Sequence, residues 1–399
     1  MIATKPERTP RYFTAVEAIV RDLKVGSMSF VLEDGRRLDA KGDAPGPHGE
    51  ILLRNPDFFA RIVRDGDLGF AEAYMDGWWD TPDLQALMDV ILLNNDNVGR
   101  GFPGQFLVRS YERLRHWMNR NTKTGSRKNI SHHYDLGNKF YGAWLDPSMT
   151  YSSALFRSNN ETLEEAQKNK YASIIDRMGA GEGDHVLEVG CGWGGFAEYA
   201  AGVRGAKVTG LTISKEQHDF AKERMFREGL NEKVDIVMRD YRDEQGKYDG
   251  VASIEMFEAV GEKYWPGYFG MIRDRLKPGA FASLQIITIA DEWFPNYRKS
   301  VDFIQKYIFP GGMLPSPTAL REQVTKAGLE FKSSIEFGKS YSDTLREWSV
   351  DFNARWDEIQ GLGFDDRFRR MWNFYLACCA STFLSGTTDV TQVAIRNPT

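Results

Sequence analysis

The sequence predicts an α/β protein whose C-terminal part is built on a doubly wound, mostly parallel sheet. From about residue 180, short apolar runs alternate with amphipathic stretches at helical spacing, which is the pattern of repeated βα units. The first of these runs, HVLEVG, leads directly into a glycine-rich turn. Residues 1–99 lack this alternation and mix short strand-like and helix-like stretches, which indicates a separate small α+β domain.

Within residues 1–99, the elements follow from local pattern. SMSFVLEDG alternates as a strand that ends in a turn at Asp34-Gly35, and EILLRNP is a short strand stopped by Pro56. FFARIVRDGDLGFAEAYMDGWWD then has apolar residues at helical spacing, with interruptions at Gly66 and Gly69. This mixture predicts a small domain with both strands and helices.

Residues 100–129 form a basic, aromatic linker in an otherwise acidic chain. Its basic side chains are Arg100, Arg109, Arg113, Arg115, Arg120, Lys123, Arg127 and Lys128, against a single acid, Glu112. One interpretation is a solvated interdomain helix and linker. The other is a patch that contacts anionic lipid head groups, at roughly 1 kcal/mol for each basic side chain near the surface. Both interpretations stay open on the sequence alone.

Residues 130–399 contain the βα array. HVLEVG, KVTGLTI, VDIVMRD, YDGVASIEMF and FASLQIITI are predicted strands, and WGGFAEYAAGV, KEQHDFAKERMFREG and a stretch ending near Leu276 are predicted helices. DEWFPNYRKSVDFIQKYIFPGGMLPSP interrupts the alternation and is interpreted as an inserted cap. RFRRMWNFYLACCASTFL is largely apolar and predicts a buried helix.

Composition excludes several classes of protein. The net charge is 51 − 56 = −5, which argues against a nucleic-acid binder held by bulk positive charge. No run of about 18 apolar residues is present that could span a bilayer. The N-terminal MIATKPERTP lacks the apolar core of a signal peptide, which favours a cytoplasmic protein. Three cysteines, Cys191, Cys378 and Cys379, argue against a disulfide framework.

The glycine-rich turn is a candidate ligand site. Glycines let the backbone turn sharply and approach a ligand at a helix N-terminus. The segment EVGCGWGG does not have the G-x-G-x-x-G spacing of dinucleotide sites. The second strand ends in GLTISKEQ, with neutral Thr212, Ser214 and Gln217 where a nicotinamide-dependent enzyme would carry an acid. A hydride-transfer function is therefore disfavoured.

Several ordered motifs give the sequence a specific resemblance. The motifs are HHYDLGNKFYGAWLDPSMTYSSALF, LEVGCGWGG, GLTISKEQ, RDYRD, MFEAVG, FIQKYIFPGGMLP and FGKSYSDTLREW. LEVGCGWGG resembles motif I of S-adenosylmethionine-dependent methyltransferases, and the whole set is similar to the cyclopropane-fatty-acyl-phospholipid synthase family, which includes the mycolic-acid cyclopropane synthases and methyltransferases. The resemblance implies a Rossmann-like class I methyltransferase domain with a helical cap over residues 130–399.

The resemblance also implies a cofactor site for S-adenosylmethionine. The tyrosine-serine pair over the cofactor corresponds to Tyr151 and Ser152, and the adenine-side pair to Tyr241 and Arg242. The residues expected to bind the cofactor are Tyr151, Ser152, Glu188, Gly190, Gly192, Gly194, Thr212, Gln217, Tyr241 and Arg242. Tyr151 and Tyr241 have an alternative interpretation as packing aromatics.

The implied reaction is transfer of a methyl or methylene carbon to the cis double bond of an unsaturated acyl chain in a membrane phospholipid. Attack by the alkene leaves a carbocation, from which a base must remove a proton. Loss from the new methyl closes a cyclopropane, whereas loss from a chain carbon gives a methyl-branched or methylene product. Aromatic faces at Tyr134, Phe257, Tyr307 or Phe309 could stabilise the cation or simply line the cavity.

In the family, the implied base is a bicarbonate ion held by a cysteine, a glutamate, a histidine and a tyrosine. The corresponding residues here are Ser153, Glu258, Gln285 and Tyr341, so the cysteine and the histidine are both replaced. In one interpretation Ser153 and Gln285 still hold the anion and the product is a cyclopropane. In the other, loss of the imidazole weakens the anion site and the enzyme is a C-methyltransferase.

The sequence supports four further expectations, about Cys379, metal binding, partners and a non-catalytic alternative. Cys379 matches a cysteine once proposed as catalytic, but a buried thiol in an apolar helix favours a structural role. His132 and His133 have no partner ligands at metal spacing, so no metal site is expected. The expected partners are phospholipid acyl chains at the inner membrane face, without nucleic acid, and a homodimer is left open. A non-catalytic lipid-binding paralogue, decayed at Ser153 and Gln285, is the rival from another class.

Overall fold

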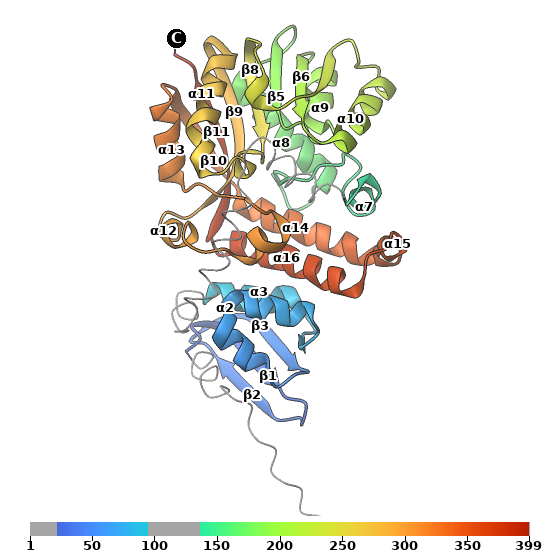
Figure 1. Cartoon of the computed structure of the whole chain (residues 1–399), viewed down its shortest axis with the longest axis vertical. Coiled ribbons are helices and arrows are strands. Elements are labelled where there is room, and N and C mark those ends of the chain that lie inside the picture. The colour runs from blue at the N-terminus through green and yellow to red at the C-terminus, as the bar shows by residue number, and fades with distance from the viewer. Residues whose placement is uncertain (1–21, 95–135, 399) are drawn as a thin grey trace, which may run out of the picture.

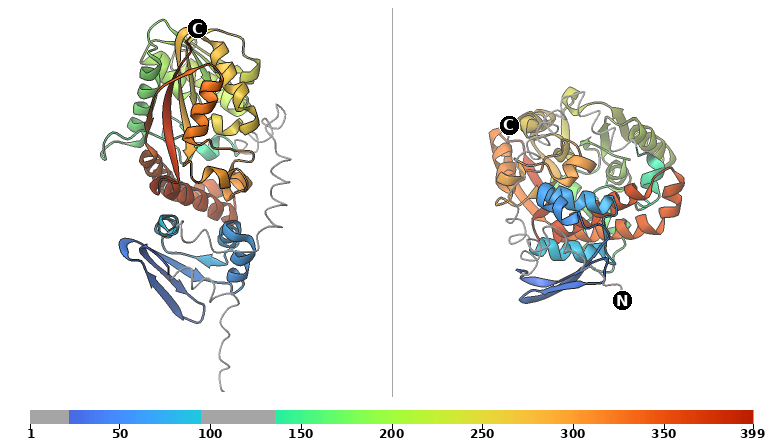
Figure 2. Two further views of the ribbon diagram at one scale, coloured as in Figure 1. Left: turned by 90° about the vertical axis from the view of Figure 1, so that its left-hand side faces the viewer. Right: turned by 60° about the horizontal axis from the view of Figure 1, so that its bottom comes forward.

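The computed structural model of the chain describes residues 22–94 and 136–398, in which two sheets are stacked along the long axis of the molecule (Figure 1). The C-terminal helices α14 (Gly338–Ala354) and α16 (Asp366–Leu384) lie between the two sheets, as the side view also shows (Figure 2). The predictions made for the linker at 100–129, and for His132, His133 and Tyr134, fall outside the described residues.

The smaller, N-terminal sheet has the order β2-β1-β3-β4. Its strands are β1 (Val25–Val31), β2 (Arg37–Lys41), β3 (Ala44–Leu53) and β4 (Trp79–Asp80). The predicted turn at Asp34-Gly35 joins the antiparallel pair β1 and β2, and β3 runs parallel to β1. Helices α2 (Phe58–Met75) and α3 (Leu84–Leu93) pack on this sheet. The interruption predicted at Gly66 is a kink within α2, where φ is 59°.

The larger sheet has seven strands in the order β10-β11-β9-β8-β5-β6-β7. They are β5 (His185–Val189), β6 (Lys207–Thr212), β7 (Val234–Met238), β8 (Tyr248–Ile254), β9 (Leu276–Ile289), β10 (Glu330–Glu336) and β11 (Thr388–Arg396). Five neighbouring strands, β9, β8, β5, β6 and β7, are parallel. Strand β11 is antiparallel to both of its neighbours, β9 and β10. The prediction of a doubly wound, mostly parallel sheet is confirmed; β10 and β11 were not predicted.

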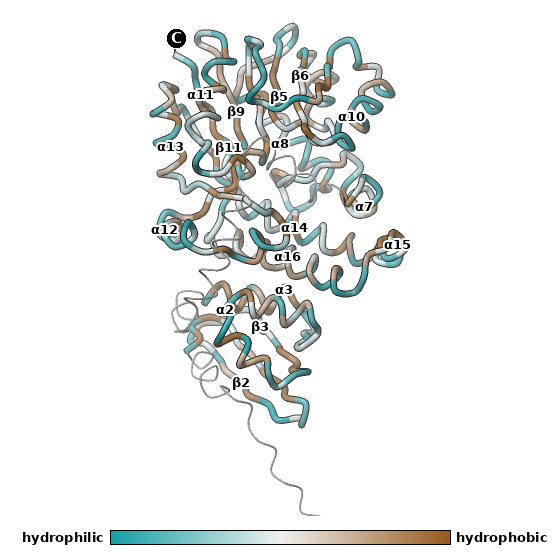
Figure 3. Tube along the Cα trace, in the orientation of Figure 1, coloured by the Kyte–Doolittle hydropathy of each residue, from teal (hydrophilic) through white to brown (hydrophobic). Residues whose placement is uncertain are grey.

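Helices cover both faces of the larger sheet. Helices α8 (Leu163–Met178), α9 (Gly195–Gly202) and α10 (Lys215–Arg227) contribute to the apolar core on one face. Helices α11 (Trp265–Arg275) and α13 (Pro317–Lys326) pack on the other. The strands β5 and β9 are hydrophobic and the outer helix α10 is largely hydrophilic (Figure 3), as this layered arrangement requires. Within the described parts of the chain, no helix is long and apolar enough to cross a bilayer.

The segment predicted as a cap follows β9 and is only partly helical. It contains α12 (Phe294–Tyr297) and a π-helical turn, Ile304–Ile308, and its other residues are irregular. Pro310 and Pro315 lack backbone donors, which prevents a longer helix here. The short helices α7 (Asn138–Gly142) and α15 (Trp356–Gly361) complete the helical elements described around the larger sheet.

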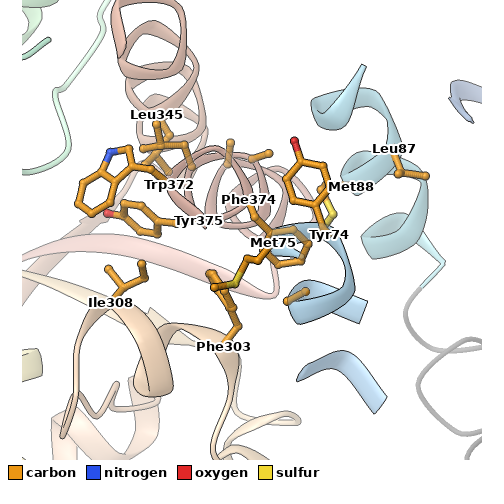
Figure 4. Packing of buried hydrophobic residues seen from close by; sticks show 14 of the residues in the cluster. Tyr74, Met75, Leu87, Met88, Phe303, Ile308, Leu345, Trp372, Phe374 and Tyr375 are labelled. Atoms are coloured by element: carbon orange, nitrogen blue, oxygen red, sulfur yellow. The ribbon is translucent and has the colours of Figure 1, made fainter. Parts of the chain in front are cut away.

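The two sheets are joined through α16, the helix predicted to be buried. Phe374 on α16 lies 6.1 Å from the ring of Phe70 on α2 and 4.9 Å from Phe303 in the cap, in an apolar junction with Tyr74 and Met75 (Figure 4). A second junction is polar. Asp89 on α3 is 8% exposed and accepts hydrogen bonds from Arg346 (2.9 Å), Ser381 (2.5 Å) and Gln85 (2.9 Å).

We predict that Asp89→Ala lowers the free energy of unfolding by about 3 kcal/mol, because it leaves the Arg346 guanidinium and the Ser381 hydroxyl without their shared acceptor. Chemical denaturation followed by tryptophan fluorescence measures the change. Asp219→Ala is the matched control, since Asp219 makes an exposed ion pair with Lys215 and its loss should leave stability nearly unchanged. Equal effects of the two substitutions would contradict a special role for the Asp89 junction.

Candidate active site

A cavity of about 650 Å³ opens at the carboxyl ends of the parallel strands. Its walls include Val189 at the end of β5, Leu211 in β6 and Ile254 at the end of β8. Ligand sites of open α/β sheets gather at this edge, at the point where the strand order reverses. Here the order reverses at β5, which lies between β6 and β8.

From the sheet edge, the cavity extends past the cap and α16 to the N-terminal sheet. Side chains from that region that line it are Met28, Phe30, Ile51, Phe58, Ile62 and Met88. The cavity therefore has a polar end at the larger sheet and a long apolar wall beyond it. This shape suits a ligand with an extended hydrocarbon part.

The glycine turn after β5 lies at the polar end. Gly190 and Gly192 line the cavity in the left-handed region, with φ of 83° and 52°. A Cβ at Gly192 would have no heavy atom within 4 Å among the described residues, so the space beside this backbone is open. Gly194 differs, because a Cβ there would lie 3.2 Å from Cβ of Ala221 on α10. Gly194 is also not among the cavity-lining residues, so its position indicates a role in helix packing.

Glu188 is the acidic residue of this turn. It is 2% exposed on β5, lines the cavity, and its Oε2 finds no hydrogen-bond donor among the described residues. Burial raises the pKa of Glu188 to about 8, against the opposing charges of Lys170 and Arg224. A cationic group entering the turn would therefore meet a buried carboxyl group that lacks a partner.

The predicted residues beyond β6 and β7 surround the same end of the cavity. Thr212 donates to Oε1 of Gln217 at 3.0 Å, and both line the cavity. Tyr241 and Arg242 line it after β7, with Arg242 held by both carboxylate oxygens of Asp240 at 2.8 and 2.6 Å. Asp240 was not singled out from the sequence, although it belongs to the RDYRD motif.

Tyr151 and Ser152 approach the cavity from the segment before α8. The Tyr151 hydroxyl lies 2.8 Å from that of Tyr375, and its ring is 5.2 Å from Trp348. Oγ of Ser152 accepts a hydrogen bond from Nζ of Lys170 at 2.7 Å. Both predicted residues line the cavity.

Glu255 lies at the centre of the residues that the sequence assigned to an anion. Its Oε1 accepts from the backbone N–H of Ser153 and from Nε2 of Gln285, each at 2.8 Å. Its Oε2 accepts from the Tyr341 hydroxyl at 2.7 Å. Ser153, Gln285 and Tyr341 therefore converge as expected, but their donors are directed at a carboxylate of the protein itself.

The two donors of Ser153 point to different partners. Its hydroxyl donates to the carbonyl of Ala154 at 2.9 Å. Only the backbone N–H of Ser153 bonds to Glu255. A backbone donor does not depend on the side chain, so replacement of the family's cysteine by serine leaves this contact available.

Sequence reasoning missed Glu255, although it stands three residues before Glu258 in SIEMFEAVG. Its backbone φ is 49°, a left-handed conformation that is uncommon outside glycine and is found at functional sites. Burial raises the pKa of Glu255, and the charge of Lys170 and the donors from Gln285, Tyr341 and Ser153 oppose this shift.

Glu258, the glutamate assigned by resemblance, lines the same cavity from the short turn Phe257–Ala259. Its Oε1 accepts from the backbone N–H of Ile287 at 2.5 Å, and its Oε2 finds no donor among the described residues. Burial, and next the charge of Glu255, raise its pKa to about 8. Two carboxyl groups with raised pKa values thus share the cavity, and the pKa of about 8 keeps Glu258 largely protonated at neutral pH.

The remaining predicted residues separate into two groups. Cys379 and Phe309 line the cavity. Burial raises the pKa of Cys379 well above its ordinary value, which keeps its thiol protonated and unreactive. Phe257 instead packs 5.3 Å from Trp265 in the core, and the Tyr307 hydroxyl donates to Glu72 of α2, so neither ring lines the cavity.

Known proteins are similar to this chain in sequence and in fold. The family model described as mycolic acid cyclopropane synthetase matches residues 121–393. The tuberculostearic acid methyltransferase UfaA1 of Mycobacterium tuberculosis is 36% identical over 92% of this chain and 86% of its own. The cyclopropane-fatty-acyl-phospholipid synthase of Escherichia coli is 36% identical over 88% of each chain. A solved structure of the mycolic acid cyclopropane synthase CmaA1, complexed with SAH and CTAB, has a TM-score of 0.64 and 28% identity, covering 68% of this chain and 98% of that one.

S-adenosylmethionine is the cofactor, and the residues at the sheet edge fit it. The open space beside Gly192 allows a ligand to approach the backbone closely. The unpartnered Oε2 of Glu188 suits the ammonium group of the cofactor's methionine part. We therefore expect Glu188 and the turn at Gly190 and Gly192 to hold that part, with Gln217, Tyr241 and Arg242 at the nucleoside.

We predict that Gly192→Val weakens S-adenosylmethionine binding by more than about tenfold, because its side chain would occupy the ligand's space. Isothermal titration calorimetry measures the affinity. Gly229→Val is the matched control: Gly229 has a comparable φ of 67°, and its Cβ would also meet open space, but it does not line the cavity. Loss of affinity in both variants would assign the effect to backbone strain.

We predict that cofactor binding below pH 8 releases a proton from Glu188. The pKa of Glu188 is about 8, so the free protein carries a neutral carboxyl at neutral pH, and a bound cation lowers that pKa. Affinity should therefore rise with pH up to about 8 and then level off. Calorimetry in buffers of different ionisation enthalpy counts the proton. Glu188→Gln should abolish the release and weaken binding by roughly tenfold to a hundredfold; an unchanged release would assign it to another group.

Proposed function

The chain belongs to the mycolic acid cyclopropane synthetase family, and we propose that it methylates the cis double bond of an unsaturated fatty acyl chain with the Glu255 carboxylate as base. Transfer of a methyl or methylene carbon from S-adenosylmethionine to lipid acyl chains is the chemistry that its relatives support. The convergence of three donors on Glu255 carries the finer proposal.

The chain's own residues supply what this reaction needs after the carbon is transferred. When bound, S-adenosylmethionine supplies an electrophilic methyl group on a cationic sulfur. Methylation of the double bond leaves a positive charge on the acyl chain, and the Glu255 carboxylate stabilises that charge in a cavity lined largely by apolar side chains. Glu255 then removes a proton from a carbon next to the cationic centre, and the electron pair of that C–H bond becomes the second bond of a new carbon–carbon double bond.

The surroundings of Glu255 suit a base that must stay in one place. Tyr341 and Gln285 hold its two oxygens, which prevents the carboxylate from turning away from the substrate. The faces of Tyr151 and Phe309, whose ring centroids are 6.5 Å apart, line the cavity and can stabilise the cation. Glu258 is protonated at neutral pH and so leaves the role of base to Glu255.

A methyl-branched or methylene chain is the product that we propose. An enzyme that binds bicarbonate must leave space for the ion, and here a protein carboxylate already takes up the donors of Ser153, Gln285 and Tyr341. The tuberculostearic acid methyltransferase also matches over 92% of the chain. A cyclopropane is the second candidate, supported by 36% identity to the Escherichia coli synthase.

Acyl chains of membrane phospholipids, reached from the cytoplasmic face, are the substrates that we propose. The long apolar wall of the cavity supports this substrate class, because a chain must leave the bilayer to reach Glu255. Transfer of label from S-adenosylmethionine to phospholipid vesicles tests it and excludes a non-catalytic paralogue. Ozonolysis of the recovered lipids then identifies the product, since a cyclopropane survives ozone and a methylated alkene is cleaved.

We predict that Glu255→Gln lowers the rate of product formation by about 10²–10⁴-fold, because the amide cannot accept the proton. Cofactor affinity, measured by calorimetry, should not change. Added bicarbonate should leave the wild-type rate unchanged. Glu255→Gly should open the anion site without straining a backbone whose φ is 49°, so that formate or bicarbonate restores part of the activity.

Glu258→Gln is the matched control in the same cavity, and we expect a smaller loss because Glu258 is already neutral at pH 7. Full activity of Glu255→Gln would overturn the assignment of the base. Exclusive formation of a cyclopropane by the wild type would overturn the proposed product while leaving the base assignment intact.

A further inference from the structure

We infer that Lys170 is a positioning residue for the reaction: its buried ammonium group is the countercharge that keeps the Glu255 carboxylate ionised. The inference rests on the proposed role of Glu255 as base. Lys170 lies on α8, is 0% exposed, and is not among the cavity-lining residues, so it acts from behind the site rather than on the substrate.

Helix α8 supports the segment 151–153 from behind through two buried side chains. Nζ of Lys170 donates to Oγ of Ser152 at 2.7 Å and lies 4.7 Å from the centre of the Tyr171 ring. One turn earlier, Nε2 of Gln167 donates to the carbonyl of Ser152 at 3.0 Å. The next residue, Ser153, presents its backbone N–H to Glu255. The ammonium group is therefore attached to the segment that holds the base.

A second path joins Lys170 to Glu255 through two buried glutamines. Nε2 of Gln392 on β11 donates to the carbonyl of Lys170 at 3.4 Å and to Oε1 of Gln285 at 3.0 Å. The opposite end of the Gln285 amide donates to Glu255. Ser173 donates to Oε1 of Gln392 at 2.6 Å, which fixes the orientation of that amide. This second path fixes the main chain of Lys170 relative to Glu255, whereas its ammonium group is held through Ser152.

Burial lowers the pKa of Lys170 to about 7. The charges of three carboxyl groups, those of Glu255, Asp146 and Glu188, oppose this shift and favour the charged ammonium group. A buried ammonium with one hydrogen bond to a neutral hydroxyl is costly, and an apolar side chain of similar length would fill the same space without that cost. The placement of the charge is therefore better explained by the carboxyl groups around it than by stability.

Lys170 provides the positive charge that acts on Glu255, and its effect is to lower the pKa of that carboxyl. The other ionisable neighbours of Glu255 are Glu258, which shares the cavity, and Tyr341, whose hydroxyl stays protonated because burial raises its pKa. Without Lys170, the Glu255 carboxyl would lose the buried ammonium group that lowers its pKa, and burial would favour its protonated form at neutral pH. A protonated Glu255 cannot accept the substrate's proton.

The test is the pH dependence of kcat for methyl transfer, measured with Lys170→Met, Lys170→Gln and Lys170→Arg at saturating cofactor. In the Met and Gln variants, the acidic limb should move to higher pH by about 1–3 units, so that activity lost at neutral pH returns as the pH rises. Lys170→Arg keeps the charge and should keep the wild-type limb. Lys170→Gln keeps a donor for Ser152, so a wild-type limb in that variant would assign the role to the hydrogen bond and overturn the inference.

Two further outcomes separate this inference from the proposed function. If Glu255→Gln is inactive but Lys170→Met lowers kcat equally at every pH, Lys170 is structural and only this inference falls. If Glu255→Gln is fully active, the base assignment fails first. In a Glu255→Gln background, Lys170→Met should cause no further loss. Lys170→Met and Lys170→Gln should both fold, with midpoints of thermal unfolding at or above that of the wild type. If neither variant folds, Lys170 is required for folding and the inference is overturned.

Discussion

A single carboxylate, that of Glu255, organises the polar part of the cavity. A buried carboxylate is stable only where donors and a countercharge replace water, and each of these comes from a different element. The segment before α8 provides a backbone N–H, β9 provides an amide and α14 provides a phenol. The left-handed backbone of Glu255, directly after β8, turns the side chain to meet them. The positions of these four elements are therefore coupled through one side chain.

The apolar part of the cavity depends on α16. This helix packs against α14 on one side and against the N-terminal helices on the other, so its residues belong to two environments at once (Figure 4). Tyr375 reaches the Tyr151 hydroxyl near the cofactor end, whereas Phe374 contacts Phe70 at the junction with α2. The N-terminal sheet thereby contributes walls to a cavity whose chemistry takes place at the other sheet. This arrangement gives the cavity the length that the proposed acyl-chain substrate requires.

The negative charge in the cavity is limited by the protonation of two carboxyl groups and by the positive charges of Lys170 and the cofactor. The pKa values of Glu188 and Glu258 are raised to about 8, so both carboxyl groups are largely neutral at pH 7 in the free protein. The cavity therefore does not hold three negative charges, one each on Glu188, Glu255 and Glu258. The cofactor's positive charge favours ionisation of Glu188 when it binds. Lys170 remains behind the site throughout, where substrate cannot reach it. This balance is consistent with the proposed role of Glu255 as a base in a largely apolar cavity.

The sequence alone predicted the βα array and the glycine turn at Gly190 and Gly192, because strand periodicity and motif spacing are local properties, and its resemblance to the family implied the set Ser153, Gln285 and Tyr341. It assigned the family's glutamate to Glu258 and did not single out Glu255, which stands three residues earlier in the same motif. The hydrogen bonds to Glu255 depend on the left-handed turn after β8 and on donors from residues 153, 285 and 341, which only the folded chain brings together. The path of the backbone likewise decides which group of Ser153 meets Glu255, because its N–H bonds to that carboxylate while its hydroxyl bonds to Ala154. Tertiary structure decided which groups meet, because hydrogen bonds between distant segments leave no periodic pattern in a sequence.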